Sequence, residues 1–199
     1  MNQRTSQRLT ALLLVICWAS RMDAQQIETY FSPNGGCAAA TIKQINAATT
    51  SIDVAAYICT SSPLANAIIE ARKRNIAIRI IVDRAQEAAT TPAPKILKSA
   101  GMDMRTDPQE KLHHNKYVII DRSIVITGSY NWSDNAEHNN AENLVVIHDT
   151  ATAAAFAADF AKHWNHSRPF VARQRKPRPR LSPQATNPTP PAPPTKKGF

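Results

Sequence analysis

The strongest constraint on the fold is an almost unbroken apolar run, IAIRIIV, at residues 76–82. Its β-branched composition predicts a strand that is largely buried. An amphipathic helix is expected just before it, at 64–73, and a further strand, SIDVAAYI, before that helix at 51–58. A strand, a helix and a second strand in this order favour a sheet whose faces are covered by helices.

The alternation of strands and helices continues through most of the chain. Further strands are expected at 26–31, 117–121, 124–127 and 144–148, and further helices at 38–48, 95–100 and 152–164. The pattern predicts an α/β layered sandwich, with a central, mostly buried mixed sheet flanked by helices. We expect Trp132, Phe160 and Trp164 to lie in the core rather than to stack on nucleic-acid bases.

The first 24 residues have the features of a secretory signal peptide. Arg4 and Arg8 precede an apolar stretch at 9–19, and small residues that suit cleavage follow at Ala19 and Ala24. The stretch is shorter than the roughly 17–25 residues of a membrane-spanning helix. A short core helix is the alternative. We expect export, to the periplasm or to the medium.

Residues 168–199 differ in composition from the rest. They hold eight Lys or Arg, no Asp or Glu, and nine of the 14 prolines, so we expect an extended basic tail. The domain left between the two ends, 25–167, has 13 basic and 14 acidic residues. The basic character therefore belongs to the tail, which is either a solvated spacer or a segment that contacts phosphate backbones or another anionic surface.

Of the three cysteines, cleavage near Ala24 would leave two, Cys37 and Cys59. In an oxidising compartment these two could form a disulfide. The sequence does not settle their separation, and so the pairing stays open.

The segment at 114–142, HNKYVIIDRSIVITGSYNWSDNAEHNNAE, carries the candidate chemistry. Lys116 follows His114 by two positions, so on a strand both side chains point to the same face. Neutral imidazole is a competent nucleophile toward phosphorus, and the ammonium can neutralise charge on phosphate oxygens. The hydroxyl of Ser129 and the amide of Asn131, after the turn at Gly128, can donate hydrogen bonds to the same oxygens.

These residues form the pattern H-x-K-x4-D-x6-G-S, which resembles that of the phospholipase D superfamily and, with GSYN and AEN, most closely the small bacterial Nuc-type endonucleases. The resemblance extends over roughly residues 28–165. It implies that Glu142 orients the nucleophilic His114 through its other ring nitrogen. It also implies that Asp121 is more a structural carboxylate at the strand corner than a phosphate contact, although Asp121 stays among the candidate catalytic residues.

The array occurs once, because no other histidine has a lysine two positions later. One imidazole cannot both attack phosphorus and protonate the oxygen that leaves on the opposite side. We therefore expect a symmetric homodimer with two copies of His114 across one site, as the Nuc resemblance also implies. No cofactor or metal is expected. His113 is adjacent to His114 and should point the opposite way, so it is expected to be structural. A metal site at this histidine pair is the alternative, but no close Cys/His/Asp cluster with ligand spacing completes it.

Three functions fit these observations. The first is an exported, metal-independent phosphodiesterase that acts as a non-specific endonuclease on DNA, with RNA as a second substrate, through a phosphohistidine. The second is a phospholipase D acting on lipid phosphodiesters. The third is a non-catalytic nucleic-acid-binding protein, against which the complete set of site residues argues.

Overall fold

The computed structural model describes residues 26–172. The predicted signal peptide, residues 1–24, and most of the basic tail lie outside this range. Among the described residues, no helix combines the length and the hydropathy that a membrane crossing requires.

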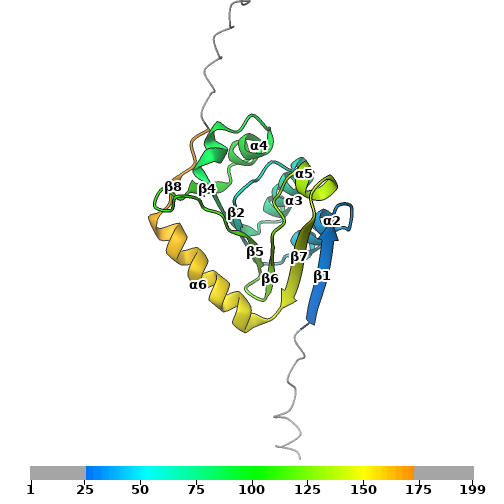
Figure 1. Ribbon diagram of the computed structural model, residues 1–199. Coiled ribbons are helices and arrows are strands. Elements are labelled where there is room, and N and C mark those ends of the chain that lie inside the picture. Colours follow the sequence, from blue (N-terminus) through cyan, green and yellow to red (C-terminus); the bar gives the residue numbers. More distant parts are fainter. Residues whose placement is uncertain (1–25, 173–199) are drawn as a thin grey trace, which may run out of the picture.

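One eight-stranded mixed sheet forms the centre of the described chain (Figure 1). Its strands stand in the order β1-β7-β6-β5-β2-β3-β4-β8, in which β2, β3 and β4 are parallel and every other pair is antiparallel. The strands are β1 (Gln26–Ser32), β2 (Ser51–Ala56), β3 (Ala77–Val82), β4 (Asp103–Thr106), β5 (Lys116–Ile120), β6 (Ile124–Gly128), β7 (Glu142–His148) and β8 (Arg168–Pro169).

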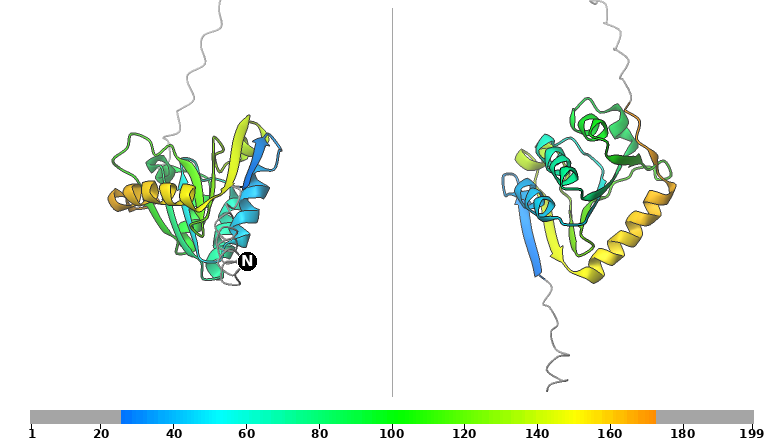
Figure 2. Two further views of the ribbon diagram at one scale, coloured as in Figure 1. Left: turned by 90° about the horizontal axis from the view of Figure 1, so that it is seen from below. Right: turned by 180° about the vertical axis from the view of Figure 1, so that it is seen from behind.

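Helices cover both faces of the sheet. One face carries α2, α3 and α4, and the long helix α6 crosses the other (Figure 2). The helical segments are α2 (Cys37–Ala47), α3 (Ser62–Lys73), the 3₁₀ turn η1 (Arg84–Ala88), α4 (Ala93–Ser99), α5 (Asp134–His138) and α6 (Thr150–His166). The predicted layered α/β sandwich with a buried mixed sheet is confirmed.

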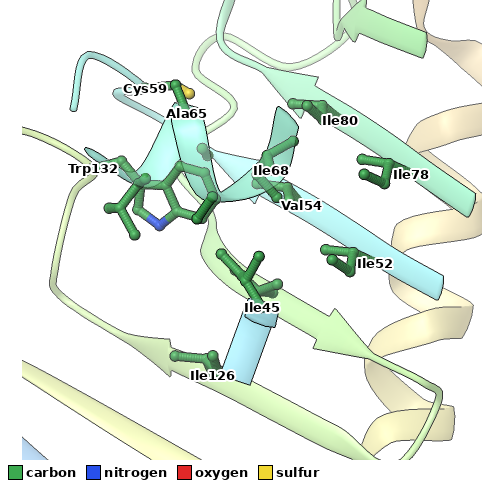
Figure 3. Packing of buried hydrophobic residues seen from close by; sticks show 14 of the residues in the cluster. Ile45, Ile52, Val54, Cys59, Ala65, Ile68, Ile78, Ile80, Ile126 and Trp132 are labelled. Carbon is green, nitrogen blue, oxygen red and sulfur yellow. The ribbon is translucent and has the colours of Figure 1, made fainter. Parts of the chain in front are cut away.

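The buried run that dominates the sequence is a central strand, as predicted. β2 and β3 run parallel with Val54 opposite Ile80, and α3 connects them. Their inward side chains pack against Ile45 of α2 and Ile68 of α3 (Figure 3). The segments that pattern analysis did not identify are short: β4, β8, η1 and α5 have two to five residues each, too few to establish a period.

The three aromatic residues expected in the core, Trp132, Phe160 and Trp164, are buried, but on opposite faces of the sheet. Trp132 belongs to the cluster beneath α2 and α3, while Phe160 and Trp164 pack under α6 on the other side (Figure 3 shows Trp132). The Arg79 guanidinium lies 4.8 Å from the centroid of the Phe160 ring and donates two hydrogen bonds to Asp53. Apolar side chains therefore cover both faces of the sheet.

The globular part of the chain ends later than predicted. Arg168 donates to Glu87 at 2.6 and 3.0 Å, and it pairs with Thr106 in the sheet. Phe170 is 2% exposed, and its N–H donates to the Met104 carbonyl. Composition alone assigned these residues to the tail, because a single buried aromatic in a proline-rich, basic segment leaves no periodic signal.

The two cysteines within the described range are free thiols. Cys37 begins α2 and Cys59 follows β2, and both are fully buried. Burial raises the pKa of Cys59 to about 12. Both sulfurs therefore act as small apolar core groups in this structure.

Candidate active site

His114 and Lys116 lie at the beginning of β5, beside the end of β2. The register places Lys116 opposite Ala56, and the N–H of Tyr57 donates to the Asn115 carbonyl, which extends the pairing past the strand ends. The Lys116 Nζ atom lies 3.2 Å from His114 Nδ1 and donates to the His114 carbonyl at 2.8 Å. The ammonium and the exposed imidazole therefore share one side of the chain, as their spacing predicted.

An aromatic ring that sequence reasoning did not assign supports this pair. The ring centroids of Tyr57 and His114 are 4.4 Å apart, and Lys116 Nζ lies 5.1 Å from the Tyr57 centroid. Burial lowers the pKa of Lys116, while the Glu142 carboxylate acts in the opposite direction. Tyr57 could have been found from its position directly after β2, because the end of β2 lies beside the beginning of β5.

A close approach between β6 and β7 fixes the next candidate. Gly128 has a φ of 151°, and a Cβ built there would lie 2.2 Å from the Asn143 carbonyl oxygen, so a side chain does not fit. The following residue, Ser129, donates its N–H to the same carbonyl. The glycine in the motif thus lets the backbone turn closely enough to place Ser129 beside β7.

Glu142, the first residue of β7, forms hydrogen bonds that differ from those the resemblance implied. Its carboxylate accepts from the Ser129 hydroxyl at 2.6 Å and from the Asn140 amide at 3.0 Å. No hydrogen bond joins Glu142 to His114 among the residues described. Within one chain, Glu142 positions the serine turn and contributes negative charge near Lys116. The Ser129 hydroxyl is correspondingly engaged by this carboxylate.

Asn131 lies on the loop that follows β6, and this loop is hydrogen-bonded to the segment between β2 and α3. The Trp132 N–H donates to the Ile58 carbonyl, and the Trp132 carbonyl accepts from the N–H groups of Thr60 and Ser61. Because Trp132 is anchored in the core, its neighbour Asn131 is held at the sheet edge. The side-chain oxygen of Asn131, which can only accept, is buried without a hydrogen-bond partner in the described part of the chain.

One cavity of about 790 Å³ brings the predicted residues together. His114, Lys116, Ser129, Asn131 and Glu142 all line it. Its other wall comes from α6, through Phe156 and Asp159, which sequence reasoning did not identify. Asp159 accepts a hydrogen bond from the Tyr117 hydroxyl at 3.0 Å. The cavity brings together an imidazole, an ammonium, a hydroxyl, an amide and two carboxylates.

Asp121 lies at the other end of β5 and does not line the cavity. Its two oxygens accept five hydrogen bonds, from the N–H groups of Thr49, Thr50 and Ser51 and from the hydroxyls of both threonines. This is the structural carboxylate that the resemblance implied, and the geometry gives it no contact with a bound phosphate.

His113, next to His114, is buried and faces away from the cavity. Its Nδ1 atom lies 3.5 Å from Asp107, whose carboxylate also contacts two histidines of α6. The sequence shows no group of potential ligands near His113, whereas the fold brings Asp107, Glu110, His163 and His166 together from segments more than 50 residues apart.

Comparisons with known proteins agree with this geometry. A family model, the PLD-like domain of cardiolipin synthase, matches residues 41–164. A phospholipase D from Rickettsia prowazekii is 34% identical over 137 residues, which are 69% of this chain and 67% of that protein. The fold is similar to that of Nuc, a phospholipase D family member from Salmonella typhimurium, with a TM-score of 0.71 and 29% identity over 74% of this chain and 99% of that one.

NucT from Helicobacter pylori superposes with a TM-score of 0.67 and 25% identity, over 73% of this chain and 99% of NucT. Both solved structures thus correspond in nearly their whole length to the domain described above. The family model alone spans more than half of the chain, and it includes the segment that carries His114, Lys116, Ser129 and Asn131. The protein is therefore a phosphodiesterase of the phospholipase D superfamily.

Proposed function

We propose that this phosphodiesterase is an exported, metal-independent endonuclease that cleaves DNA, and RNA as a second substrate, with little sequence preference. The observation that carries the proposal is the single exposed His114 beside Lys116, in a cavity on a fold that matches Nuc and NucT over nearly their full length. A site that grips one phosphate offers no groups that read bases, and hence little selectivity.

The reaction follows from the cavity residues. A ring nitrogen of His114 attacks phosphorus, forms an N–P bond, and the P–O bond to the leaving nucleotide breaks. Lys116 and the amide of Asn131 stabilise the charge on the non-bridging oxygens. Water then attacks the phosphohistidine, the N–P bond breaks, and the second product leaves with a phosphate end.

Proton transfer requires a second group on the far side of phosphorus. Of the histidines in the described range, His114 alone lines the cavity. We therefore place a second copy of His114, from a twofold-related chain, opposite the first. It protonates the leaving oxygen in the first step and takes a proton from the attacking water in the second.

Lipid phosphodiesters are the second candidate, favoured by the relative named phospholipase D. One assay separates the candidates: the purified full chain, in EDTA, is incubated with plasmid DNA, RNA, labelled phosphatidylcholine and labelled cardiolipin. We expect cleavage of the nucleic acids and turnover of neither lipid. Lipid hydrolysis with intact plasmid would overturn the proposal, and binding of DNA without cleavage would indicate a non-catalytic protein.

The basic tail provides a second test. Because Arg168 and Phe170 belong to the domain, the truncation is placed after Ala172 and removes seven Lys or Arg. We expect unchanged turnover at saturating DNA, weaker DNA binding, and a salt dependence whose log–log slope falls by up to about 0.9 for each phosphate that the tail no longer neutralises. Equal slopes for the two proteins would remove the tail from substrate binding.

A further inference from the structure

Behind the catalytic segment, four potential metal ligands from two distant parts of the chain converge. Asp107 and Glu110 lie in the loop after β4, and His163 and His166 lie in the last turn of α6. One ligand atom from each lies within 4.8 Å of every other. The two histidines are three positions apart on a helix, so they project from one face. None of the four lines the catalytic cavity.

Asp107 is the centre of this cluster. Its side chain is fully buried, and its Oδ2 atom lies 2.8 Å from His163 Nδ1 and 3.0 Å from His166 Nε2. Around a tetrahedral ion with bonds near 2.0–2.2 Å, ligand atoms lie about 3.3 Å apart. The two Asp107–histidine distances are therefore a few tenths of an ångström shorter than those around a bound ion, and all four ligand atoms lie within 4.8 Å of one another.

His113 supplies an independent observation. It is 1% exposed, and neither of its ring nitrogens has a hydrogen-bond partner among the residues of the structure. Its Nδ1 atom points at the cluster, 3.5 Å from the same Asp107 oxygen. A buried imidazole without a partner is costly. The Asp107 carboxylate is hydrogen-bonded to His163 and His166, and His113 is left without a hydrogen bond. A cation at the cluster would provide a partner for this third imidazole.

We propose that Asp107, Glu110, His163 and His166 bind one divalent transition-metal ion, with Zn²⁺ the best match, and that His113 is positioned as a further ligand. Two or three imidazoles with one or two carboxylates suit Zn²⁺ and its neighbours, whereas Mg²⁺ and Ca²⁺ prefer oxygen ligands. A metal-bound ring nitrogen must be unprotonated, so metal affinity at this cluster should fall as the pH is lowered.

The surroundings resemble the outer contacts of protein metal sites. The other ring nitrogen of His163 lies 3.6 Å from an oxygen of Asp159, the kind of carboxylate partner that fixes the ring of a ligating histidine. Asp159 and its donor Tyr117 line the catalytic cavity. The ion would thus join the end of α6 to residues 107–113, directly before the nucleophile, in a structural role.

This role is independent of the proposed nuclease chemistry. In the structure, Asp107 already links the loop to α6 through both histidines, so removing the ion leaves the segment held by hydrogen bonds. We therefore expect a chelated protein to stay folded and to keep its phosphodiesterase activity, with a lower unfolding temperature.

The test is a Zn²⁺ titration of the full chain, produced without a histidine tag and stripped with EDTA. Calorimetry should show saturation at one ion per chain, and the unfolding temperature should rise with free Zn²⁺. His166→Gln should weaken binding at least about ten-fold, the loss that even outer partners of a metal cause. Glu110→Gln, at an exposed position that folding tolerates, should weaken it as well.

His138→Gln is the matched control, because His138 is exposed on α5 and distant from the cluster in the sequence. It should bind Zn²⁺ like the parent chain. His114→Ala should do so too. Absence of saturable binding would overturn the proposal. Unchanged affinity in both the His166 and Glu110 variants would also do so, as would binding that disappears with His114, which would place the ion in the catalytic cavity.

Discussion

The two ends of β5 carry residues of the same sequence motif but do different work. At its beginning, His114 and Lys116 stand beside the cavity, with an exposed imidazole and an ammonium whose pKa burial lowers. At its end, Asp121 turns away and accepts five hydrogen bonds from the segment that starts β2. A strand of five residues separates the two ends by roughly 16 Å.

The difference shows what such a motif encodes. In the proposed mechanism the first part supplies the reacting groups, whereas the aspartate binds the segment that starts the neighbouring strand β2. β2 lies next to β5, and Tyr57 at the end of β2 contacts His114. Asp121 therefore acts on the site only through the alignment of two strands. Substitutions at the two ends should separate chemistry from stability.

The largest effect is expected from His114→Ala. Loss of the nucleophile should lower turnover of a phosphodiester by about 10⁴-fold or more, as removal of a central catalytic group does in other enzymes. The unfolding temperature should stay near that of the parent chain, because the side chain is exposed. Initial rates on plasmid DNA and on a chromogenic phosphodiester measure the effect, with His138→Ala as the matched control. Turnover within ten-fold of the parent would assign the nucleophile elsewhere.

Lys116→Met should have the next largest effect. Removing one group that stabilises transition-state charge typically lowers turnover by about 10²- to 10³-fold. Lys116→Arg should restore part of the loss, because it keeps the charge but not the compact geometry of the ammonium. Lys43→Met, at an exposed position on α2, is the control. If Lys116→Met and Lys116→Arg reduce turnover equally, the position of the ammonium rather than its charge alone limits the reaction.

Much of the site was predictable because its information is local. The two-residue spacing of His114 and Lys116 and the Gly128–Ser129 pair can each be recognised from neighbouring residues in the sequence. The same holds for β3 and its helix. Hydrophobic patterns over six or more residues identified those elements, whereas β4 and β8 have four and two residues and show no period.

The remainder depends on tertiary packing. Asp159 reaches the cavity only because α6 crosses the sheet face over β5 and β6, and Asp107 meets His163 across 56 positions. The hydrogen bond from Ser129 to Glu142 likewise follows from the register of β6 and β7. No spacing rule in one sequence contains these contacts.

The smallest expected effect on turnover belongs to Asp121→Asn, which tests the far end of β5. An amide keeps one acceptor oxygen but places an NH2 group against N–H and hydroxyl donors that now bind the other oxygen. We expect unchanged turnover and a free energy of unfolding lower by about 2 kcal/mol at neutral pH. Urea denaturation measures the change, and Asp134→Asn, at an exposed position on α5, is the control.

The pH dependence gives the sharper form of this prediction. Burial alone raises the pKa of Asp121, but the N–H groups of Ser51, Thr50 and Thr49 outweigh it and hold the pKa well below its ordinary value of 3.8. The carboxylate therefore stabilises the fold fully above the unfolded pKa, and this contribution is lost as pH falls through 3.8 toward the folded value. The stability difference between the parent and Asp121→Asn should accordingly be largest at pH 7 and shrink below about pH 4. A difference that is constant down to pH 3 would mean that the charge of Asp121 does not hold the two strands together, and the contrast between the ends of β5 would then rest on shape alone.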